Sequence, residues 1–307
     1  MLVGCSSAAG SPAGLEPRSN GADGGAAAST APSPDASAAD SPTDAGPAGA
    51  VACAAKTTVG DPRPVGAYEL VRGKLYVVFS EITQTDRASW IETSNTYVIR
   101  GVAEDGGTAV WIFGSGYGDG KPLATMPYPR TAQAPSRTGA VDASDADGII
   151  RGCLGLTPSQ ARLRFVAPHY HFDHFNFDFI GGLLSHGYSL DQAKLWIHAA
   201  DYTQAFCGAG CTGNGGSLPA FPPELQAKTT PIGNSGDTCG TEVGGFDTDG
   251  LGHFRIVSDP GHTPGTISLD SDSLLVRFTG GAAQDPCPFP PGYRRSHVHG
   301  NLAGVWP

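Results

Sequence analysis

Short runs rich in hydrophobic residues recur along this chain, with polar residues and glycines between them. The first three stretches span residues 68–79, 95–100 and 108–113, which are rich in Val, Ile, Tyr, Phe and Trp and are separated by Gly, Asp and Ser. This pattern is typical of strands. We expect these stretches to form the opening antiparallel strands of a sheet.

A helical pattern follows the opening strands. Ser144, with Asp147 three positions later, is typical of a helix start, and residues 149–154 carry an apolar stripe. Residues 162–165 alternate between arginine and an apolar residue and predict a strand that leads to Pro168. The remaining predicted elements are strands at 194–198, 266–269 and 274–279, a helix at 201–206, and a long irregular loop at 208–250.

Three histidines and one aspartate lie within the six residues after Pro168, which read His169-Tyr170-His171-Phe172-Asp173-His174. Imidazole nitrogens and carboxylate oxygens are ligands that suit zinc and similar divalent ions. Alternate side chains of an extended backbone point the same way, so His169 and His171 can converge on one ion while Asp173 and His174 reach a second. A histidine-rich surface loop is the alternative interpretation, which the position after a strand disfavours.

A further histidine, His262, lies in Pro260-Gly261-His262-Thr263-Pro264-Gly265, directly after the alternating residues 253–257. Gly and Pro on both sides restrict the backbone, which suits a metal ligand. Together the two motifs resemble those of the metallo-β-lactamase superfamily, over residues 66–307. The resemblance implies an αββα sandwich, in which two mixed β-sheets pack face to face, helices flank them, and a metal site lies at one edge.

The resemblance also implies the metal ligands. One zinc ion would be held by three histidines, His169, His171 and His262. A second would be held by Asp173, His174 and one of two histidines near the C-terminus, His297 and His299. We therefore expect one or two Zn²⁺ ions, with His299 favoured over His297 because a glycine follows it as in the family.

The chain departs from the family pattern where relatives carry further ligands. Gly114 stands where an Asp at a strand end is usual, and Gly281 stands where many of the hydrolases carry an Asp that bridges two metals. Against the Gly-Gly-Cys arrangement of some β-lactamases, Ala282 replaces the metal-binding Cys. Neither alignment supplies a ligand for the second metal.

The activity that the resemblance implies is zinc-dependent hydrolysis of a small carbonyl substrate, such as a β-lactam, a lactone, an ester or a thioester. Zinc lowers the pKa of bound water to about 7, so hydroxide is available to attack the carbonyl carbon. Asp173 would be the catalytic residue that orients the nucleophile. One alternative is a non-catalytic metal-binding lipoprotein with a degraded second site; another is redox chemistry at a di-iron centre, which relies on additional carboxylates.

Other residues of chemical interest have ordinary interpretations. His186, His198 and His253 each stand alone in a helix or strand context and are interpreted as non-ligands. The alternating aromatic residues at 175, 177 and 179 favour core packing over the wall of a substrate pocket.

Charge argues against nucleic acid as a partner. The 307 residues carry a net charge of −10 and contain no run rich in Lys or Arg. Nucleic-acid binding relies on a basic patch that neutralises phosphates. We therefore expect a small-molecule substrate as the partner; the oligomeric state is not predicted.

Residues 1–50 differ from the rest of the chain. They contain no aromatic residue and no Lys, and they consist mostly of Ala, Gly, Ser, Pro and Thr, which bury too little apolar surface to fold. We predict a disordered tether over residues 1–50 and one metallo-β-lactamase-like domain over residues 51–307.

The chain begins with Leu2-Val3-Gly4-Cys5, which resembles a bacterial lipobox. This implies a lipid anchor at Cys5, as the expected membrane contact, and a bacterial cell-envelope location at the periplasm or outer membrane, or secretion. A chance cysteine in a disordered tail is the alternative.

The six other cysteines are an even number that an oxidising compartment can pair. The sequence does not fix their pairing. We expect a disulfide-stapled loop containing Cys207, Cys211 and Cys239, in preference to a metal clip at Cys207 and Cys211.

Overall fold

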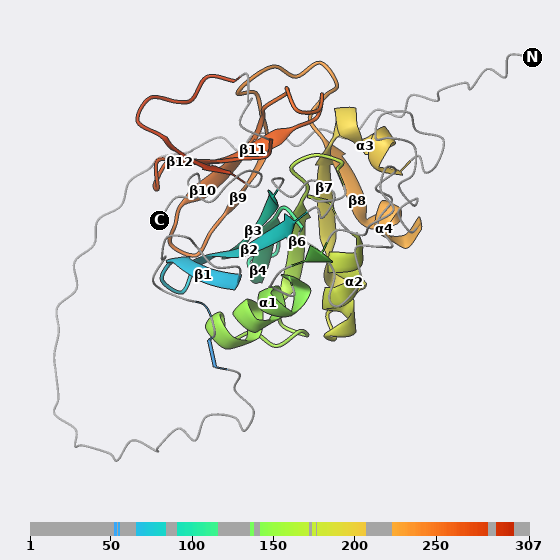
Figure 1. The fold of residues 1–307 in the computed structure, drawn as a ribbon, viewed down its shortest axis with the longest axis vertical. Helices are drawn as coiled ribbons and strands as arrows, with labels where there is room; N and C mark the ends of the chain where they lie inside the picture. The colour runs from blue at the N-terminus through green and yellow to red at the C-terminus, as the bar shows by residue number, and fades with distance from the viewer. Residues whose placement is uncertain are drawn as a thin grey trace, which may run out of the picture. The chain divides into compact units, whose positions relative to one another are not determined.

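Two β-sheets with helices beside them make up the structure, which is a computed structural model (Figure 1). It describes residues 52–53, 55, 66–83, 91–115, 136–137, 142–171, 174–175, 177–206, 223–281 and 287–297.

The larger sheet opens with the strands that the runs of apolar residues predict. It contains β1 (Gly66–Val71), β2 (Leu75–Thr83), β3 (Ile91–Val102), β4 (Thr108–Phe113), β5 (Ser136–Arg137), β6 (Arg162–Val166), β7 (Lys194–His198) and β8 (Thr229–Ile232). The strand order is β1-β2-β3-β4-β6-β7-β8, and β5 pairs with β2. The pairs β1–β2, β2–β3 and β3–β4 are antiparallel, whereas the pairs β4–β6, β6–β7 and β7–β8 are parallel, so the sheet is mixed.

Residues 68–79 form parts of two strands rather than the single strand expected. A turn at residues 72–74 separates β1 from β2, and the Lys74 amide closes it by donating to the Val71 carbonyl at 3.0 Å. Gly73 in this turn has a φ of 69°, which glycine adopts without steric cost. The expectation was wrong because apolar residues continue on both sides of this short turn.

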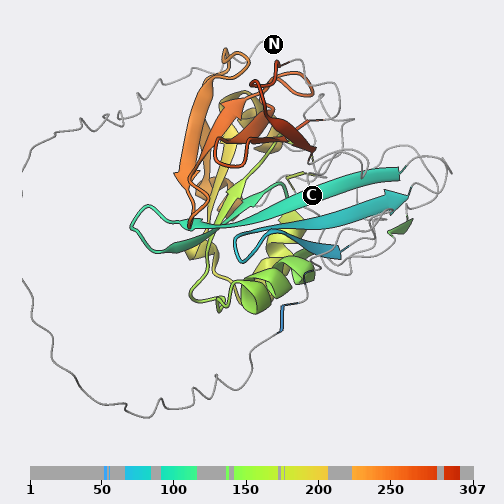
Figure 2. The ribbon, with the colours of Figure 1, turned by 90° about the vertical axis from the view of Figure 1, so that its left-hand side faces the viewer.

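The smaller sheet follows in sequence. It contains β9 (Glu242–Asp247), β10 (His253–Ser258), β11 (Ile267–Ser271), β12 (Val276–Thr279) and β13 (Arg294–His297). The order is β13-β12-β11-β10-β9, with all neighbours antiparallel except β12 and β13, which run parallel. Figure 2 shows its orange to red strands beside the larger sheet. Two mixed sheets with flanking helices confirm the fold class that the sequence predicts.

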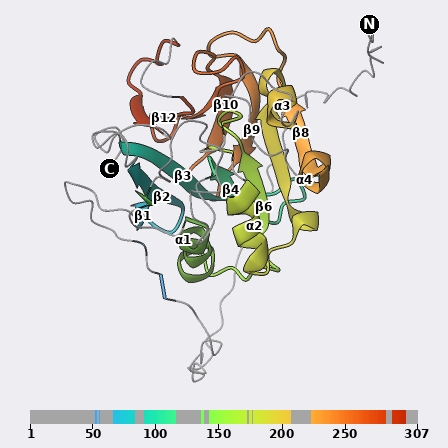
Figure 3. The same ribbon diagram turned by 45° about the vertical axis from the view of Figure 1, so that its right-hand side comes forward.

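The helices contribute to a core on one face of the larger sheet (Figure 3). They are α1 (Asp142–Gly148), a π-helix at Ile149–Cys153, α2 (Phe177–Ser185), a 3-10 helix at Leu190–Gln192, α3 (Ala199–Phe206) and α4 (Pro223–Lys228). Ser144, expected at a helix start, lies inside α1. Because α4, β8 and β9 fall within residues 208–250, a single irregular loop there is wrong. None of the described helices is both long and apolar enough to cross a membrane.

Successive residues along the strands of the larger sheet point to opposite faces and belong to two separate apolar cores. Tyr97 packs with Phe254 and Phe278 of the smaller sheet, and the Tyr97 and Phe278 ring centroids are 4.8 Å apart. The next residue, Val98, belongs to the other core, together with Phe179 of α2. This alternation is what a strand buried on both faces requires.

The outer face of the smaller sheet is covered differently. Arg277 of β12 and Arg295 of β13 hold the Phe289 ring, with their guanidinium carbons 5.3 and 4.2 Å from its centroid. Arg277 is buried and forms a two-point ion pair with Asp270 of β11. Phe289, from the segment between β12 and β13, therefore packs on this face of the smaller sheet.

Two disulfides join distant parts of the described chain. Cys53 is bonded to Cys153, and Cys239 is bonded to Cys287. Of the expected disulfide-stapled loop containing Cys207, Cys211 and Cys239, the structure describes only Cys239, which is disulfide-bonded to Cys287 with a Cα–Cα distance of 5.2 Å. Cys207 and Cys211 lie outside the described residues.

A buried arginine in the middle of β6 forms an ion pair with a glutamate. The Arg164 side chain donates to a Glu104 carboxylate oxygen at 2.8 Å, and Lys194 lies 3.1 Å from the other oxygen. Although burial alone raises the pKa of Glu104, the hydrogen bonds from Arg164 and Lys194 lower it from 4.5 to about 2. Glu104 is therefore a carboxylate in the folded protein at any pH well above 2.

Glu104→Gln is expected to lower the free energy of unfolding by about 1 kcal/mol at pH 7, a modest value because nearly half of the Glu104 side chain is exposed. Since the folded pKa is depressed, this contribution is fully present above pH 4.5 and is lost as the pH falls through 2. Urea titrations between pH 2 and 7 measure it.

The matched control is Asp191→Asn, which removes an exposed carboxylate paired with Lys228 and should change little. A stability difference between wild type and Glu104→Gln that stays constant down to pH 2 would contradict this account.

Candidate metal centre

His169 and His171 follow the C-terminal end of β6, where the backbone leaves the larger sheet. Two backbone hydrogen bonds fix this exit: the Ala167 amide donates to the Trp196 carbonyl, and the Ile267 amide donates to the Pro168 carbonyl, both at 2.8 Å. The second bond ties the loop to β11 of the smaller sheet. The histidine loop is therefore held between the two sheets.

His262 lies in the turn between β10 and β11. The Asp259 amide donates to the Thr266 carbonyl at 2.8 Å, and the Thr263 amide donates to the Thr266 hydroxyl at 2.8 Å. These bonds close the turn at its base, which is what the Gly- and Pro-bounded motif predicts. His262 consequently has a backbone position fixed by β10 and β11.

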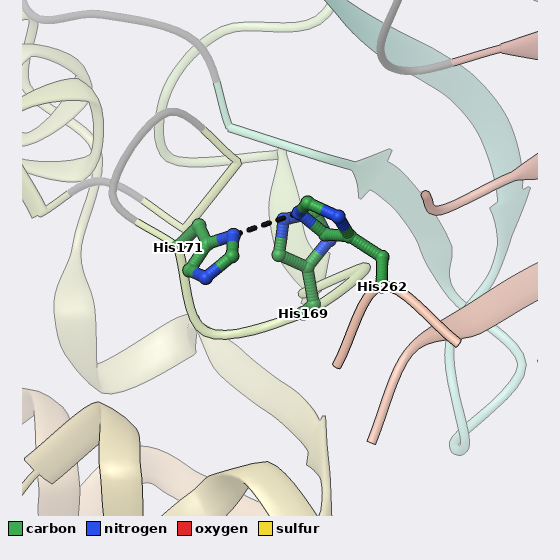
Figure 4. A group of neighbouring side chains, drawn as sticks. All are labelled: His169, His171 and His262. Atoms are coloured by element: carbon green, nitrogen blue, oxygen red, sulfur yellow. Dashed lines mark hydrogen bonds between the residues drawn. The ribbon is translucent and has the colours of Figure 1, made fainter. Parts of the chain in front are cut away.

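The two loops bring three histidines together, as Figure 4 shows. One ligand atom from each of His169, His171 and His262 lies within 4.8 Å of the others, and we call these three residues the triad. The His171 Nδ1 and His262 Nε2 atoms are 2.8 Å apart. His169 is buried, His171 is half-buried and His262 is exposed, so the cluster is accessible from one side.

His169 is oriented by a backbone carbonyl. Its Nδ1 lies 2.7 Å from the Gly280 oxygen, and because a carbonyl only accepts, Nδ1 carries the proton. Nε2 is then the nitrogen that can bind a metal, which is the usual way in which a second partner fixes the tautomer of a ligand histidine.

Gly280 is itself held in place. The Gly280 amide donates to the Ser268 hydroxyl at 3.2 Å, and that hydroxyl donates to the Asp259 carboxylate at 2.5 Å. A Cβ at position 280 would lie 1.9 Å from the Ile267 carbonyl oxygen, so only glycine fits. Burial raises the pKa of Asp259, although the hydrogen bond from Ser268 and the charge of Arg277 oppose the shift.

The donor set fits a divalent transition metal. Three neutral imidazoles are ligands that zinc accepts, and zinc bonds to nitrogen of roughly 2.0–2.1 Å place tetrahedral nitrogens about 3.3 Å apart. The spacings of 2.8 Å for His171 and His262, and up to 4.8 Å within the triad, bracket that value. The three imidazoles are therefore close enough together to hold one ion.

The residues predicted for a second metal are only partly described. His174 is buried, and its ring centroid lies 4.7 Å from that of His169. Asp173 and His299 lie outside the described residues. The backbone of His297 pairs with Thr279, directly before Gly280, and its side chain lies outside the description. The second ligand set stays a prediction.

The two glycines at the positions where the resemblance leads us to expect carboxylates have different surroundings. Gly114 has a φ of 77°, and the next amide, that of Ser115, donates to the His174 carbonyl at 2.9 Å. Gly281 is buried beside Gly280. Neither position carries a side chain that can bind an ion.

The histidines interpreted as non-ligands lie outside the triad. His186 contacts Ser144, His198 contacts Asp237, and His253 contacts Asp247. The aromatic residues at 175 and 179 are buried in the core, as expected, and Phe177 packs against it. A separate cavity of about 580 Å³ is lined by basic residues, Asp191 and Trp196, and includes none of the three histidines.

Sequence reasoning missed Asp201, in the first turn of α3. Its carboxylate accepts hydrogen bonds from the Tyr170 amide at 3.2 Å, the Thr263 hydroxyl at 2.6 Å and the Gly265 amide at 2.8 Å. Burial raises the pKa of Asp201, and these three donors oppose that rise. The sequence signal was an acidic residue at a predicted helix start, which also has a common explanation in the helix dipole.

No protein-family model matches the chain, and no curated protein matches it. The chain is similar to three solved structures of particular interest. A metallo-β-lactamase from Erythrobacter litoralis is 14% identical, covering 69% of this chain and 68% of that one, with a TM-score of 0.36. A metallo-β-lactamase family protein from Thermus thermophilus is 15% identical, covering 66% and 58%, with a TM-score of 0.33.

The third is the chemotaxis sensor ODP from T. denticola in its apo state, which is 13% identical, covering 71% of this chain and 65% of that one, with a TM-score of 0.33. Two of the three carry the name of the family that the histidine motifs resemble. At these identities and TM-scores the similarity says nothing about metal or substrate. The fold assignment rests on the two sheets and on the helices that pack against one face of the larger sheet.

Proposed function

We propose that this protein is a metal-dependent hydrolase of the metallo-β-lactamase type, with zinc as its metal and a small carbonyl compound as its substrate. The observation that carries the proposal is the convergence of His169, His171 and His262 from two loops, with ligand atoms within 4.8 Å of one another. Two of these ligands come from the loop after β6 and the third from the turn after β10, so the fold brings them together.

The type of donor supports zinc over other common metals. Imidazole nitrogens suit zinc, whereas magnesium and calcium prefer oxygen ligands. A di-iron centre normally uses additional carboxylates, and Gly281 offers none. The triad is neutral, so a bound divalent ion would keep its full positive charge and act as a Lewis acid that lowers the pKa of bound water to about 7.

The chain's own residues divide the remaining tasks. His169 is buried and fixed by Gly280, so it sets the position of the site. His171 and His262 face the accessible side, from which a substrate approaches. Asp173, adjacent to His174 in sequence, is the residue we assign to orienting the attacking water and passing its proton to the leaving group.

We also propose that the protein works outside the cytoplasm, anchored by lipid at Cys5 or secreted. The disulfides Cys53–Cys153 and Cys239–Cys287 support this, because disulfides persist in oxidising compartments and are rare in the cytosol. A small-molecule substrate is consistent with that location.

Turnover of the full-length, zinc-loaded protein against β-lactam, lactone, ester, thioester and phosphodiester substrates tests the proposal. We expect hydrolysis of one carbonyl class, its loss with a chelator and its recovery with added zinc. The control variant is His253→Ala, which removes an exposed histidine outside the triad. Activity that a chelator leaves unchanged contradicts the proposal, and retained zinc without any turnover favours the non-catalytic alternative.

A further inference from the structure

Asp201 receives three hydrogen bonds although it is completely buried. One carboxylate oxygen accepts from the Tyr170 amide and the Thr263 hydroxyl, and the other accepts from the Gly265 amide. An ionised carboxylate is acceptor-only and has about four lone-pair sites, so it can serve all three donors. A neutral amide side chain cannot, because it replaces one acceptor oxygen with a donor.

The three donors belong to the two histidine loops. Tyr170 stands between His169 and His171, and Thr263 directly follows His262. Gly265 closes the second motif. Asp201 comes from a third element, α3, whose first turn follows the last residue of β7. One side chain thus bonds to both loops that carry the triad.

The space around Asp201 is matched to this role. A Cβ at Gly265 would lie 2.6 Å from the Asp201 carboxylate carbon and from one of its oxygens, so any side chain there would displace the carboxylate. The second glycine of the Pro-Gly-His-Thr-Pro-Gly motif therefore allows the close approach of Asp201. Gly265 in this motif thus has a packing role as well as the backbone role inferred from the sequence.

The backbone alone joins the loops more loosely. The bond from the Ile267 amide to the Pro168 carbonyl sets the base of the two loops, before His169 and after the His262 turn. The hydrogen bonds from Tyr170 and Thr263 to Asp201 instead join the two loops at residues next to the histidines. Their loss would let the Tyr170 and Thr263 backbones separate while the sheets stay paired.

We infer that Asp201 is a positioning residue that fixes the spacing of the two histidine loops and thereby sets the affinity of the triad for its metal. The inference rests on the proposed metal site and deepens it. Outer-shell partners of metal ligands typically contribute about 10–100-fold in affinity. Asp201 acts one step further out, through the backbone of the ligand loops, and serves both loops together.

Two variants of the full chain test the inference. Asp201→Asn keeps the shape of the side chain and removes one acceptor, and Thr263→Val removes a single donor to it. The matched control is Thr229→Val: Thr229 is also buried, and its hydroxyl donates to the Leu225 carbonyl at 2.7 Å, within the helix-to-strand junction of α4 and β8. Thr263→Val and Thr229→Val each remove the hydroxyl of a buried threonine.

Three quantities are measured for each variant: zinc affinity by competition with a chromophoric chelator, the absorption spectrum with cobalt in place of zinc, and stability in urea. We expect Asp201→Asn to weaken zinc binding about 10–100-fold and to alter the cobalt spectrum, with a smaller change of the same kind in Thr263→Val. Thr229→Val is expected to lose stability while keeping wild-type affinity and spectrum.

His171→Ala separates this inference from the proposed function. If His171→Ala loses zinc while Asp201→Asn and Thr263→Val bind it as wild type does, Asp201 is not a positioning residue and the proposed site stands. If wild type itself does not bind zinc, the proposed site falls and the inference falls with it. If Asp201→Asn does not fold, Thr263→Val decides.

Discussion

His171→Ala is expected to abolish tight zinc binding and chelator-sensitive turnover while leaving the fold intact. His171 is one of three ligands in the triad, and with only His169 and His262 left a zinc ion would lose a third of its protein ligands. The loss of affinity should exceed the roughly 10–100-fold change typical of an outer-shell partner. Metal content after dialysis and initial rates measure it.

The fold should tolerate this change because of where the side chain lies. His171 is only half-buried, and its ring contacts His169 and His262 of the triad and, among core residues, Tyr170. Substitutions outside a core usually change stability by no more than about 0.5 kcal/mol. His253→Ala is the matched control, and wild-type rates in His171→Ala would remove the proposed site.

Removal of the Cys53–Cys153 disulfide is expected to have the largest effect on stability. The two cysteines are 100 residues apart in sequence, and a cross-link that closes a loop of this length contributes about 4.7 kcal/mol in the chain-entropy model. The double variant Cys53→Ser/Cys153→Ser avoids an odd thiol. Urea unfolding should show a loss of about 2–5 kcal/mol in the free energy of unfolding.

The location of this disulfide predicts that its loss affects stability rather than the site. Cys153 ends the π-helix of the helical layer and packs against that core, whereas the triad lies in loops that follow β6 and β10. The folded double variant should therefore keep its zinc affinity. Equal unfolding free energies for wild type and the double variant would contradict the assignment.

The triad was predictable because its information is local. His169 and His171 lie two positions apart, and His262 lies in a turn whose Gly and Pro residues mark it in the sequence. Strand positions were predictable for the same reason, since short runs of β-branched and aromatic residues between Gly, Asp and Ser are themselves local signals. The turn at residues 72–74 was missed because it interrupts the run of apolar residues only briefly.

The supporting residues were not predictable from the sequence because they act across long separations. Asp201 is 62 residues from Thr263, and His169 is 111 residues from Gly280. The pairing of Cys239 with Cys287 likewise depends on how the chain after β12 returns along the smaller sheet. A single sequence shows such residue types but not their partners.

Two positions where the resemblance leads us to expect carboxylates carry glycine. The resemblance alone supports that expectation at Gly281 and Gly114, whereas the structure itself explains a glycine of the second motif, Gly265, by its close approach to Asp201. Family motifs therefore identified the histidines, and physical packing identified the residue that joins their loops.

X-ray absorption at the zinc edge of the full-length, zinc-loaded protein would observe the triad and its ion together. We predict that zinc is retained through dialysis, with at least three imidazole nitrogens at roughly 2.0–2.1 Å, and that this signal is lost in His171→Ala. Failure to retain zinc, or a first shell made only of oxygen atoms, would contradict a metal site formed by His169, His171 and His262.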